Sequence, residues 1–369
     1  MSIYGICPIG LLGFPQGQEQ RAIPVKRGDW VAVLINAKID ALLEATSRSF
    51  YPTLKYLPKK IRGQIGLLYL LARVADTIAD SKHGDTDALL KLLHDYNNVA
   101  QGRSSSLPDF SELAAMQTNE NEAELLRNVP DVVAGLEVYT TEDQKLMLEC
   151  LEVIVSGQVL DLERFGTANE GGTISALQSD KEMDDYAFRV AGSVGVFWSK
   201  MSLEHLISLP PEKEKEFLEK GIRFGKALQM INILRDIPED LRFGRCYIPN
   251  DSLNRYSLKP DDLMNDENID DFRPLYDEYL DITNDHLKAA VEYIGMLPEK
   301  QMRLKASCML PVLIGQRTVT LLRTGNILNS EERIKVTRDE IKSYARKLLL
   351  ALIIPGGVSR LLKKNKDSQ

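Results

Sequence analysis

Two groups of carboxylates occur within otherwise apolar stretches of this 369-residue sequence. The first comprises Asp76 and Asp80, and the second comprises Asp236, Glu239 and Asp240. Residues four apart share one face of a helix, so each group predicts two carboxylates one turn apart. Mg²⁺ prefers hard oxygen ligands and commonly joins one or two carboxylates to substrate phosphates. These five residues are therefore predicted as metal ligands at a site for a diphosphate, whose departure a metal ion would assist.

Polar residues around each group continue the helical spacing. Arg73 precedes Asp76 by three residues, while Gln229 and Asn232 lead into Asp236 at the same intervals. Each group is thus predicted to lie on one face of one continuous helix. A lone pair of aspartates is commonly a solvated helix face. Two pairs set in apolar sequence favour function, because an unpaired buried carboxylate is costly.

Composition limits the classes of protein. Hydrophobic residues make up 44% of the chain, enough for a large core, and the net charge of −7 argues against nucleic-acid binding. The four cysteines form no C-x-x-C pair and the four histidines no H-x-x-x-H pair, so no zinc site is predicted. Scattered cysteines fit a reducing compartment, and we expect a cytoplasmic protein.

Apolar residues repeat with helical period along nearly the whole chain, and strand-like alternation is almost absent, which predicts an all-α fold. The predicted helices are 31–47, 61–80, 87–99, 142–165, 183–209, 212–241, 272–296, 302–322 and 338–352. Polar breaks are predicted at 101–124, 166–180 and 242–271. No repeat or linker divides the chain. We expect one domain over 1–369, with its core at about 31–352 and with 1–27 and 353–369 peripheral.

Neither a signal peptide nor a membrane span is expected, because no apolar run reaches about 18 residues. The run 348–354 is apolar and is flanked by Arg346, Lys347 and Arg360. It is predicted either as a core helix or as a contact with an anionic bilayer surface, on the inner face of the membrane.

Five motifs, in order over roughly residues 40–300, resemble the squalene/phytoene synthase family. They are Ser47-Arg-Ser-Phe50 with Leu57-Pro58, Arg73-x-x-Asp-Thr-Ile-Ala-Asp80, Tyr186-Ala-Phe-Arg-Val-Ala-Gly-Ser-Val-Gly195, Gln229-x-x-Asn-Ile-Leu-Arg-Asp-Ile-Pro-Glu-Asp240 and Gly244-Arg-x-Tyr-x-Pro249. The resemblance implies a single α-helical isoprenoid synthase domain with a central cavity. Its two aspartate-rich helices would hold Mg²⁺ and two prenyl diphosphates on opposite walls.

The reaction implied is head-to-head condensation. One diphosphate ionises to an allylic cation, the second substrate attacks, and proton loss gives a cyclopropylcarbinyl diphosphate that ionises again and rearranges. Tyr186 is implied as proton relay or cation stabiliser, although a buried structural tyrosine is the competing interpretation. Small residues follow it at Ala187, Ala191, Gly192 and Gly195, and they predict either room for a prenyl chain or tight helix packing.

The remaining site predictions combine residue chemistry with the family motifs. Asp76, Asp80, Asp236 and Asp240 join Tyr186 as catalytic residues. Residues predicted to bind the diphosphates are Ser47, Arg48, Ser49, Arg73, Gln229, Asn232 and Arg245, with Arg189 and Arg235 ranked below them. Because water would quench a carbocation, the cavity must be dry. Its predicted lining is Phe50, Tyr51, Leu160, Val190, Val194, Phe197 and Leu228.

The first two motifs most resemble squalene synthases, whereas the segment from Gly244 to Pro249 is closer to bacterial carotenoid-type members. We therefore expect a bacterial type of squalene synthase, for sterol or hopanoid biosynthesis, acting on two farnesyl diphosphates with Mg²⁺ and NADPH. The alternatives are a dehydrosqualene, hydroxysqualene or phytoene synthase that uses no NADPH. A non-catalytic helical partner protein would have lost an aspartate from either group. A head-to-tail elongase or terpene cyclase would lack the motifs at Tyr186 and Gly244.

Overall fold

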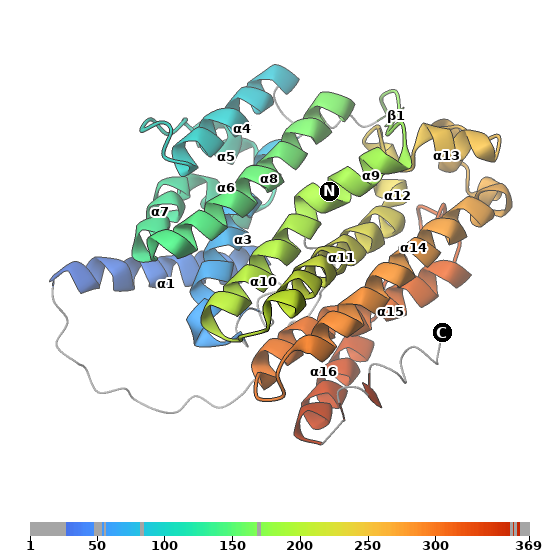
Figure 1. Cartoon of the computed structure of the whole chain (residues 1–369). Coiled ribbons are helices and arrows are strands. Elements are labelled where there is room, and N and C mark those ends of the chain that lie inside the picture. The colour runs from blue at the N-terminus through green and yellow to red at the C-terminus, as the bar shows by residue number, and fades with distance from the viewer. Residues whose placement is uncertain are drawn as a thin grey trace.

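Helices make up most of the computed structural model, which describes residues 27–47, 54, 57–81, 85–167, 171–354, 357 and 360–361. The α-helices are α1 (Arg27–Ser47), α3 (Lys59–Ala79), α4 (Thr86–Ala100), α5 (Ser111–Met116), α6 (Glu120–Arg127), α7 (Val129–Ala134), α8 (Thr141–Phe165), α9 (Asp180–Ala187), α10 (Ser193–His205), α11 (Pro211–Arg235), α12 (Ile237–Arg242), α13 (Asn250–Arg255), α14 (Ile269–Met296), α15 (Met302–Thr324) and α16 (Arg338–Ile353). Elements α1 to α8 gather on one side of the bundle and α10 to α16 on the other (Figure 1). The all-α prediction is confirmed.

Helix α3 carries the first aspartate group through the interior. Its residues from Gln64 to Ala72 are all buried, as expected of a helix that is apolar on every side. It packs against α8 and α4, while α1 covers it from another direction. Asp76 consequently has no solvent-exposed surface.

A π-helical segment, η2 (Phe188–Gly192), joins α9 to α10 without a break in helical backbone. The following α10 runs antiparallel to α11 and touches it closely. A Cβ atom on Gly195 would lie 2.0 Å from the carbonyl oxygen of Gly221, and one on Gly225 would lie 2.0 Å from that of Ala191. Ala191 and Gly195 therefore serve tight helix packing, one of the two predicted roles, and both also line the cavity described below.

The predicted helix 212–241 is two helices, because α11 ends at Arg235 and α12 starts at Ile237. Pro238 has no N–H to donate to the carbonyl of Leu234, which lies four residues earlier. The hydroxyl of Tyr276 donates to that oxygen instead, at 3.0 Å. The second aspartate group therefore straddles a helix junction, and Asp240 lies on α12 rather than on the face of α11.

The predicted breaks also hold short elements. Helices α5 and α6 begin within 101–124. The stretch 242–271 holds α13 and the 3₁₀ turns η3 (Pro260–Met264) and η4 (Asp266–Asn268), and a third such turn, η1 (Gly135–Val138), follows α7. A two-residue parallel ladder pairs β1 (Ser175–Ala176) with β2 (Arg245–Cys246). Gly244, with φ of +78°, turns the chain into β2. The ladder fixes Arg245 beside α8.

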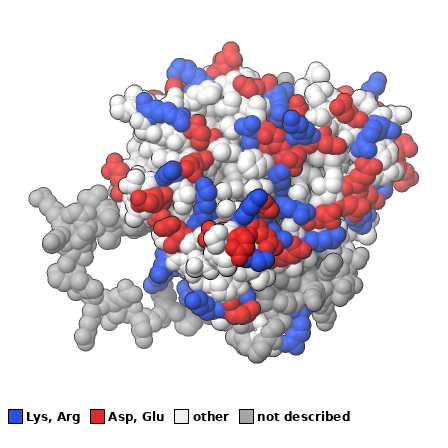
Figure 2. Space-filling model, viewed as in Figure 1, with Lys and Arg blue, Asp and Glu red and all other residues white. Residues whose placement is uncertain are grey.

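Acidic and basic side chains are interspersed over the face drawn in Figure 2. Ion pairs between exposed side chains of different helices include Lys200 of α10 with Glu149 of α8 at 3.0 Å. Such exposed pairs add little to stability. The charges that matter for chemistry lie inside the bundle.

Candidate active site

The first aspartate group is held by hydrogen bonds from two helices. Arg73, one turn earlier on α3, donates to one oxygen of Asp76, and the amide of Gln158 on α8 donates to the other at 3.2 Å. Arg73 also donates to Glu122 on α6. Burial, with the charge of Asp80 adding to it, raises the pKa of Asp76 to about 7. The carboxyl therefore retains a proton up to near-neutral pH in the metal-free protein.

Arg245 joins that group to a third acid. Its Nη1 atom lies 3.3 Å from a carboxylate oxygen of Asp80 and 3.4 Å from one of Asp161 on α8. The side chain is only 4% exposed. Its Nε and Nη2 atoms are buried and find no hydrogen-bond partner among the described residues. These donors are available to an anion.

The second group divides between two environments. Arg235 donates twice to Asp236, at 2.8 and 2.6 Å, and Arg333 donates at 2.9 Å. Although burial favours the neutral acid, the two guanidinium groups hold the pKa of Asp236 below its usual range. Burial raises the pKa of Asp240 well above its usual range, and its Oδ2 atom has no partner in the described part of the chain. Glu239 is about half exposed, 3.5 Å from Arg333.

Two amides on α11 are the least satisfied polar groups of the site. Gln229 and Asn232 are 1% and 0% exposed. None of their four amide oxygen and nitrogen atoms has a hydrogen-bond partner among the described residues. Since nearly all buried polar groups in proteins are hydrogen-bonded, such orphans indicate atoms kept for a ligand.

A pair of stacked tyrosines adjoins the acids. The rings of Tyr186 and Tyr247 lie 4.9 Å apart, and their hydroxyl oxygens are separated by 3.5 Å. Tyr247 donates to Asp161 at 2.6 Å. Burial raises the pKa of Tyr186 well above its usual value, so its hydroxyl is protonated. The order Tyr186, Tyr247, Asp161 forms a chain along which a proton can move.

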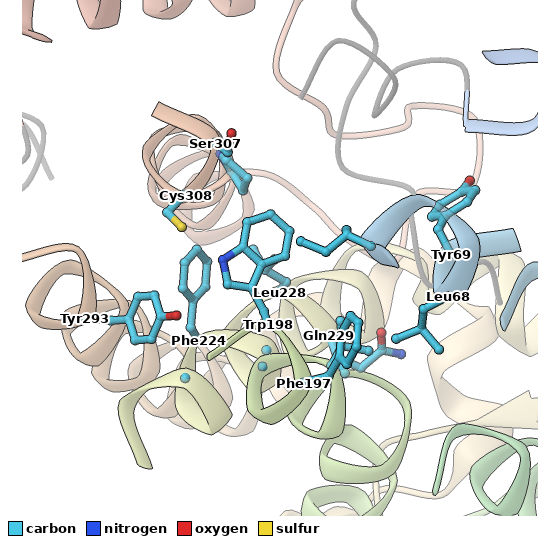
Figure 3. A pocket seen from close by; sticks show the side chains of 17 residues that line it. Leu68, Tyr69, Phe197, Trp198, Phe224, Leu228, Gln229, Tyr293, Ser307 and Cys308 are labelled. Carbon is cyan, nitrogen blue, oxygen red and sulfur yellow. The ribbon is translucent and has the colours of Figure 1, made fainter. Parts of the chain in front are cut away.

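An apolar cavity of about 150 Å³ extends from the amide of Gln229 between α3, α10, α11, α14 and α15. Figure 3 shows Leu68 and Tyr69 toward one end and Tyr293 toward the other. The full lining is Ile65, Leu68, Tyr69, Ala191, Val194, Gly195, Phe197, Trp198, Gly221, Phe224, Gly225, Leu228, Gln229, Tyr293, Ser307, Cys308 and Pro311. An extended apolar chain would fit along it, with a polar head at the aspartates.

The donor set fits Mg²⁺ bound together with a substrate. Among the described residues, no three acidic, histidine or cysteine side chains converge to hold a metal ion alone. Mg²⁺ usually takes only one or two carboxylates and completes its shell with waters and substrate phosphates. The unpartnered carboxylate oxygen of Asp240 is a donor of that kind, and the amides of Asn232 and Gln229 would be free to contact the substrate phosphates.

The model of the family described as Squalene/phytoene synthase matches residues 43–340. The chain belongs to this family. Its members are enzymes of the prenyltransferase type that act on prenyl diphosphates.

The relatives differ in product. Squalene synthase of Bos taurus is 24% identical over 84% of this chain and 68% of its own length. The 4,4'-diapophytoene synthase of Staphylococcus haemolyticus is 22% identical over 70% of this chain and 78% of its own. Against the human squalene synthase, the chain spans only 56% of that protein's length.

The fold is shared with solved structures. That of TcSQS with the ligand E5700 has a TM-score of 0.74, with 18% identity over 90% of each chain. Squalene synthase HpnC of Alicyclobacillus acidocaldarius has a TM-score of 0.58, with 17% identity over 80% of this chain and 95% of its own.

In this squalene/phytoene synthase, only some of the residues predicted to line the cavity do so. Val194, Phe197 and Leu228 line the cavity. Val190 is instead buried against Gly157 of α8, and Leu160 also lies outside the lining. Phe50 and Tyr51 lie outside the described residues, as do Arg48 and Ser49.

Three further predicted contacts to diphosphate have other partners in the structure. The hydroxyl of Ser47 donates to the carbonyl of Leu43. Arg189 donates to Asp185 and Ser156, each at 2.8 Å. Arg235 pairs with Asp236, as noted above.

Five residues of the site were not predicted, namely Glu122, Gln158, Asp161, Tyr247 and Arg333. Tyr247 lies within the motif that starts at Gly244, and Asp161 is a lone acid between two leucines of an amphipathic helix. Both are sequence signals of a buried polar group. Arg333 lies in a loop far along the chain, where no local pattern marks it.

Proposed function

We propose that this chain condenses two farnesyl diphosphates head to head, through presqualene diphosphate, to squalene, with Mg²⁺ and NADPH. One observation carries the proposal: buried polar atoms of Gln229, Asn232, Asp240 and Arg245 have no hydrogen-bond partner among the described residues, and Gln229 also lines the apolar cavity. Such an arrangement suits a substrate with an anionic head and a long apolar tail.

Ionisation of the first substrate leaves a diphosphate that needs compensating charge. Asp76, Asp80, Asp236 and Asp240 would hold Mg²⁺, which when bound neutralises the leaving group. Arg245 offers Nε and Nη2 as a two-pronged donor to phosphate oxygens. Because it is fixed by the ladder and by Asp161, little reorganisation is needed as charge develops.

Cyclopropane formation releases a proton, and the tyrosine pair gives it a route. Tyr247 donates to Asp161, and its hydroxyl oxygen lies 3.5 Å from that of Tyr186. Once Tyr247 has passed its proton to Asp161, its oxygen can take the proton of Tyr186. The oxygen of Tyr186 can then take the proton lost from the substrate. Burial raises the pKa of Asp161, which makes this carboxylate a better final acceptor.

The cavity protects the cation between these steps. Apart from Gln229, the side chains near its open end are apolar or aromatic, such as Leu68, Val194 and Leu228. The apolar surface that they present to the cavity disfavours water, which would otherwise capture the cation as an alcohol. The reductive ending with NADPH rests on the similarity to squalene synthases.

The test is to incubate the purified chain with farnesyl diphosphate and Mg²⁺, with and without NADPH, and to identify the product by mass spectrometry. Squalene formed only with NADPH is the expected result. Dehydrosqualene or an alcohol formed regardless of NADPH would replace the reductive proposal. An Asp236→Ala variant should form no product, whereas Asp271→Ala, an exposed acid on α14, should behave as the parent.

We also propose that the enzyme works in the cytoplasm against the inner face of the membrane, where its apolar product dissolves. No helix of the described chain is long and apolar enough to cross a bilayer. Leu349 and Leu350 of α16 are more than half exposed, and Arg346 and Lys347 are exposed one turn earlier. Apolar residues beside basic ones are typical of a helix that binds an anionic surface.

A further inference from the structure

The length of the cavity can be read along α11, which runs beside it. The lining on this helix begins with Gly221 and ends with Gln229, and Asn232 follows at the polar end. The eleven helical steps from Gly221 to Asn232 span about 16 Å at 1.5 Å per step. This distance is the space between the polar head site and the far end of the cavity.

A prenyl chain can be measured on the same scale. Each residue of an extended polypeptide advances about 3.5 Å over three backbone bonds, or about 1.2 Å per bond. Three isoprene units in line have eleven such bonds and extend about 13 Å, while four units have fifteen and extend about 18 Å. The available length lies between the two values.

Aromatic side chains close the far end. Trp198 on α10 lies twelve residues beyond Tyr186 and lines the cavity. Phe224 meets Tyr293 edge to face at 5.9 Å. Figure 3 shows the three rings gathered along the cavity, away from Leu68 and Tyr69.

The floor behind these rings is rigid. Tyr293 stacks on Phe217 at 4.2 Å, and its hydroxyl hydrogen-bonds to Ser199 at 3.1 Å. Movement of Tyr293 would therefore break a stack and a buried hydrogen bond. Displacement of Tyr293 by a longer prenyl chain would therefore be energetically unfavourable.

We infer that Trp198, backed by Phe224 and Tyr293, limits the substrate to three isoprene units. The inference rests on the proposed function and specifies which prenyl diphosphate the site selects. Truncation of Trp198 would open space for a fourth unit while leaving the head site intact.

The experiment compares farnesyl and geranylgeranyl diphosphate as sole substrates, with Mg²⁺, by the rate of diphosphate release and by the mass of the product. The variants are Trp198→Ala and, in case that protein folds poorly, Phe224→Ala. Phe197→Ala is the matched control, because it removes a ring beside Gln229 without lengthening the cavity (Figure 3). Thermal melts establish that each variant is folded.

The parent should favour farnesyl diphosphate. Trp198→Ala or Phe224→Ala should raise the geranylgeranyl-to-farnesyl ratio of kcat/KM at least about tenfold, a factor that corresponds to the burial of fewer than two methylene groups. An unchanged ratio in both folded variants, or the same rise in Phe197→Ala, would overturn this inference but leave the proposed function standing. So would a parent that uses both substrates equally. A parent inactive on both would overturn the proposed function.

Discussion

Replacement of Asn232 by leucine should make the metal-free protein more stable while it abolishes activity. Asn232 has no exposed surface, and neither atom of its amide is hydrogen-bonded within the described chain. A buried amide without partners costs about 1–3 kcal/mol, and leucine has nearly the same branched shape. The free energy of unfolding should therefore rise by about 1–3 kcal/mol.

Differential scanning calorimetry without metal measures this effect. For a chain of this size, 1 kcal/mol corresponds to about 1.3 °C in Tm, so a rise of about 1–4 °C is expected. The control is Asn97→Leu on α4. The amide of Asn97 is also buried, but it donates to Glu152 at 3.1 Å. Its replacement should therefore lower the free energy of unfolding by about 1 kcal/mol.

The same variants are then assayed for function. Asn232→Leu should lose about 10²–10³-fold in kcat, the usual effect of removing one oriented group from a charged transition state. Its Tm should also respond less than that of the parent to Mg²⁺ with inorganic diphosphate. A lower Tm in the metal-free variant, or near-normal turnover, would refute the view that this amide is kept for a ligand.

Three other outcomes follow from the site and the surface. The raised pKa of Asp76 means that the folded state binds a proton more tightly than the unfolded state, so the metal-free parent should lose stability between about pH 4 and pH 7 more steeply than Asp76→Asn. Equal slopes in their Tm against pH would contradict this assignment. Tyr186→Phe should slow the formation of presqualene diphosphate more than its conversion to product. Tyr247→Phe should have the same effect, and the double variant should be no slower than either single one. Equal losses in separate assays of the two steps would indicate packing roles. Leu349→Ser with Leu350→Ser should weaken sedimentation with anionic vesicles at unchanged turnover in detergent, and unaltered sedimentation would argue against the bilayer contact.

The sequence was sufficient to predict those features that local spacing encodes. Period and apolar content predicted the long helices, and the positions of Asp76 and Asn232 followed from three- and four-residue intervals. The junction at Asp236 was missed despite Pro238, because the hydroxyl that replaces the lost backbone donor comes from Tyr276, on another helix. The local sequence shows that Pro238 lacks a backbone donor, but it does not show which distant group replaces that donor.

Tertiary contacts account for the remaining differences. Asp161 and Arg333 join the site through partners that are distant in sequence. Arg189 has the right chemistry for phosphate, yet Asp185 lies one turn before it and pairs with it. Residue type and spacing predict what a side chain can bind, whereas its actual partner depends on the packing of whole helices.

The contact between α10 and α11 has a consequence for how the product could change in evolution. With the carbonyl of Gly221 against Gly195 and that of Ala191 against Gly225, the two helices are already at their closest approach. Substitutions on this wall cannot draw the backbones nearer, and larger residues at the glycines would separate them. The backbone on this side of the cavity is thus fixed in position. A single substitution of a side chain that lines the cavity is therefore the simplest inherited change that would yield a different hydrocarbon.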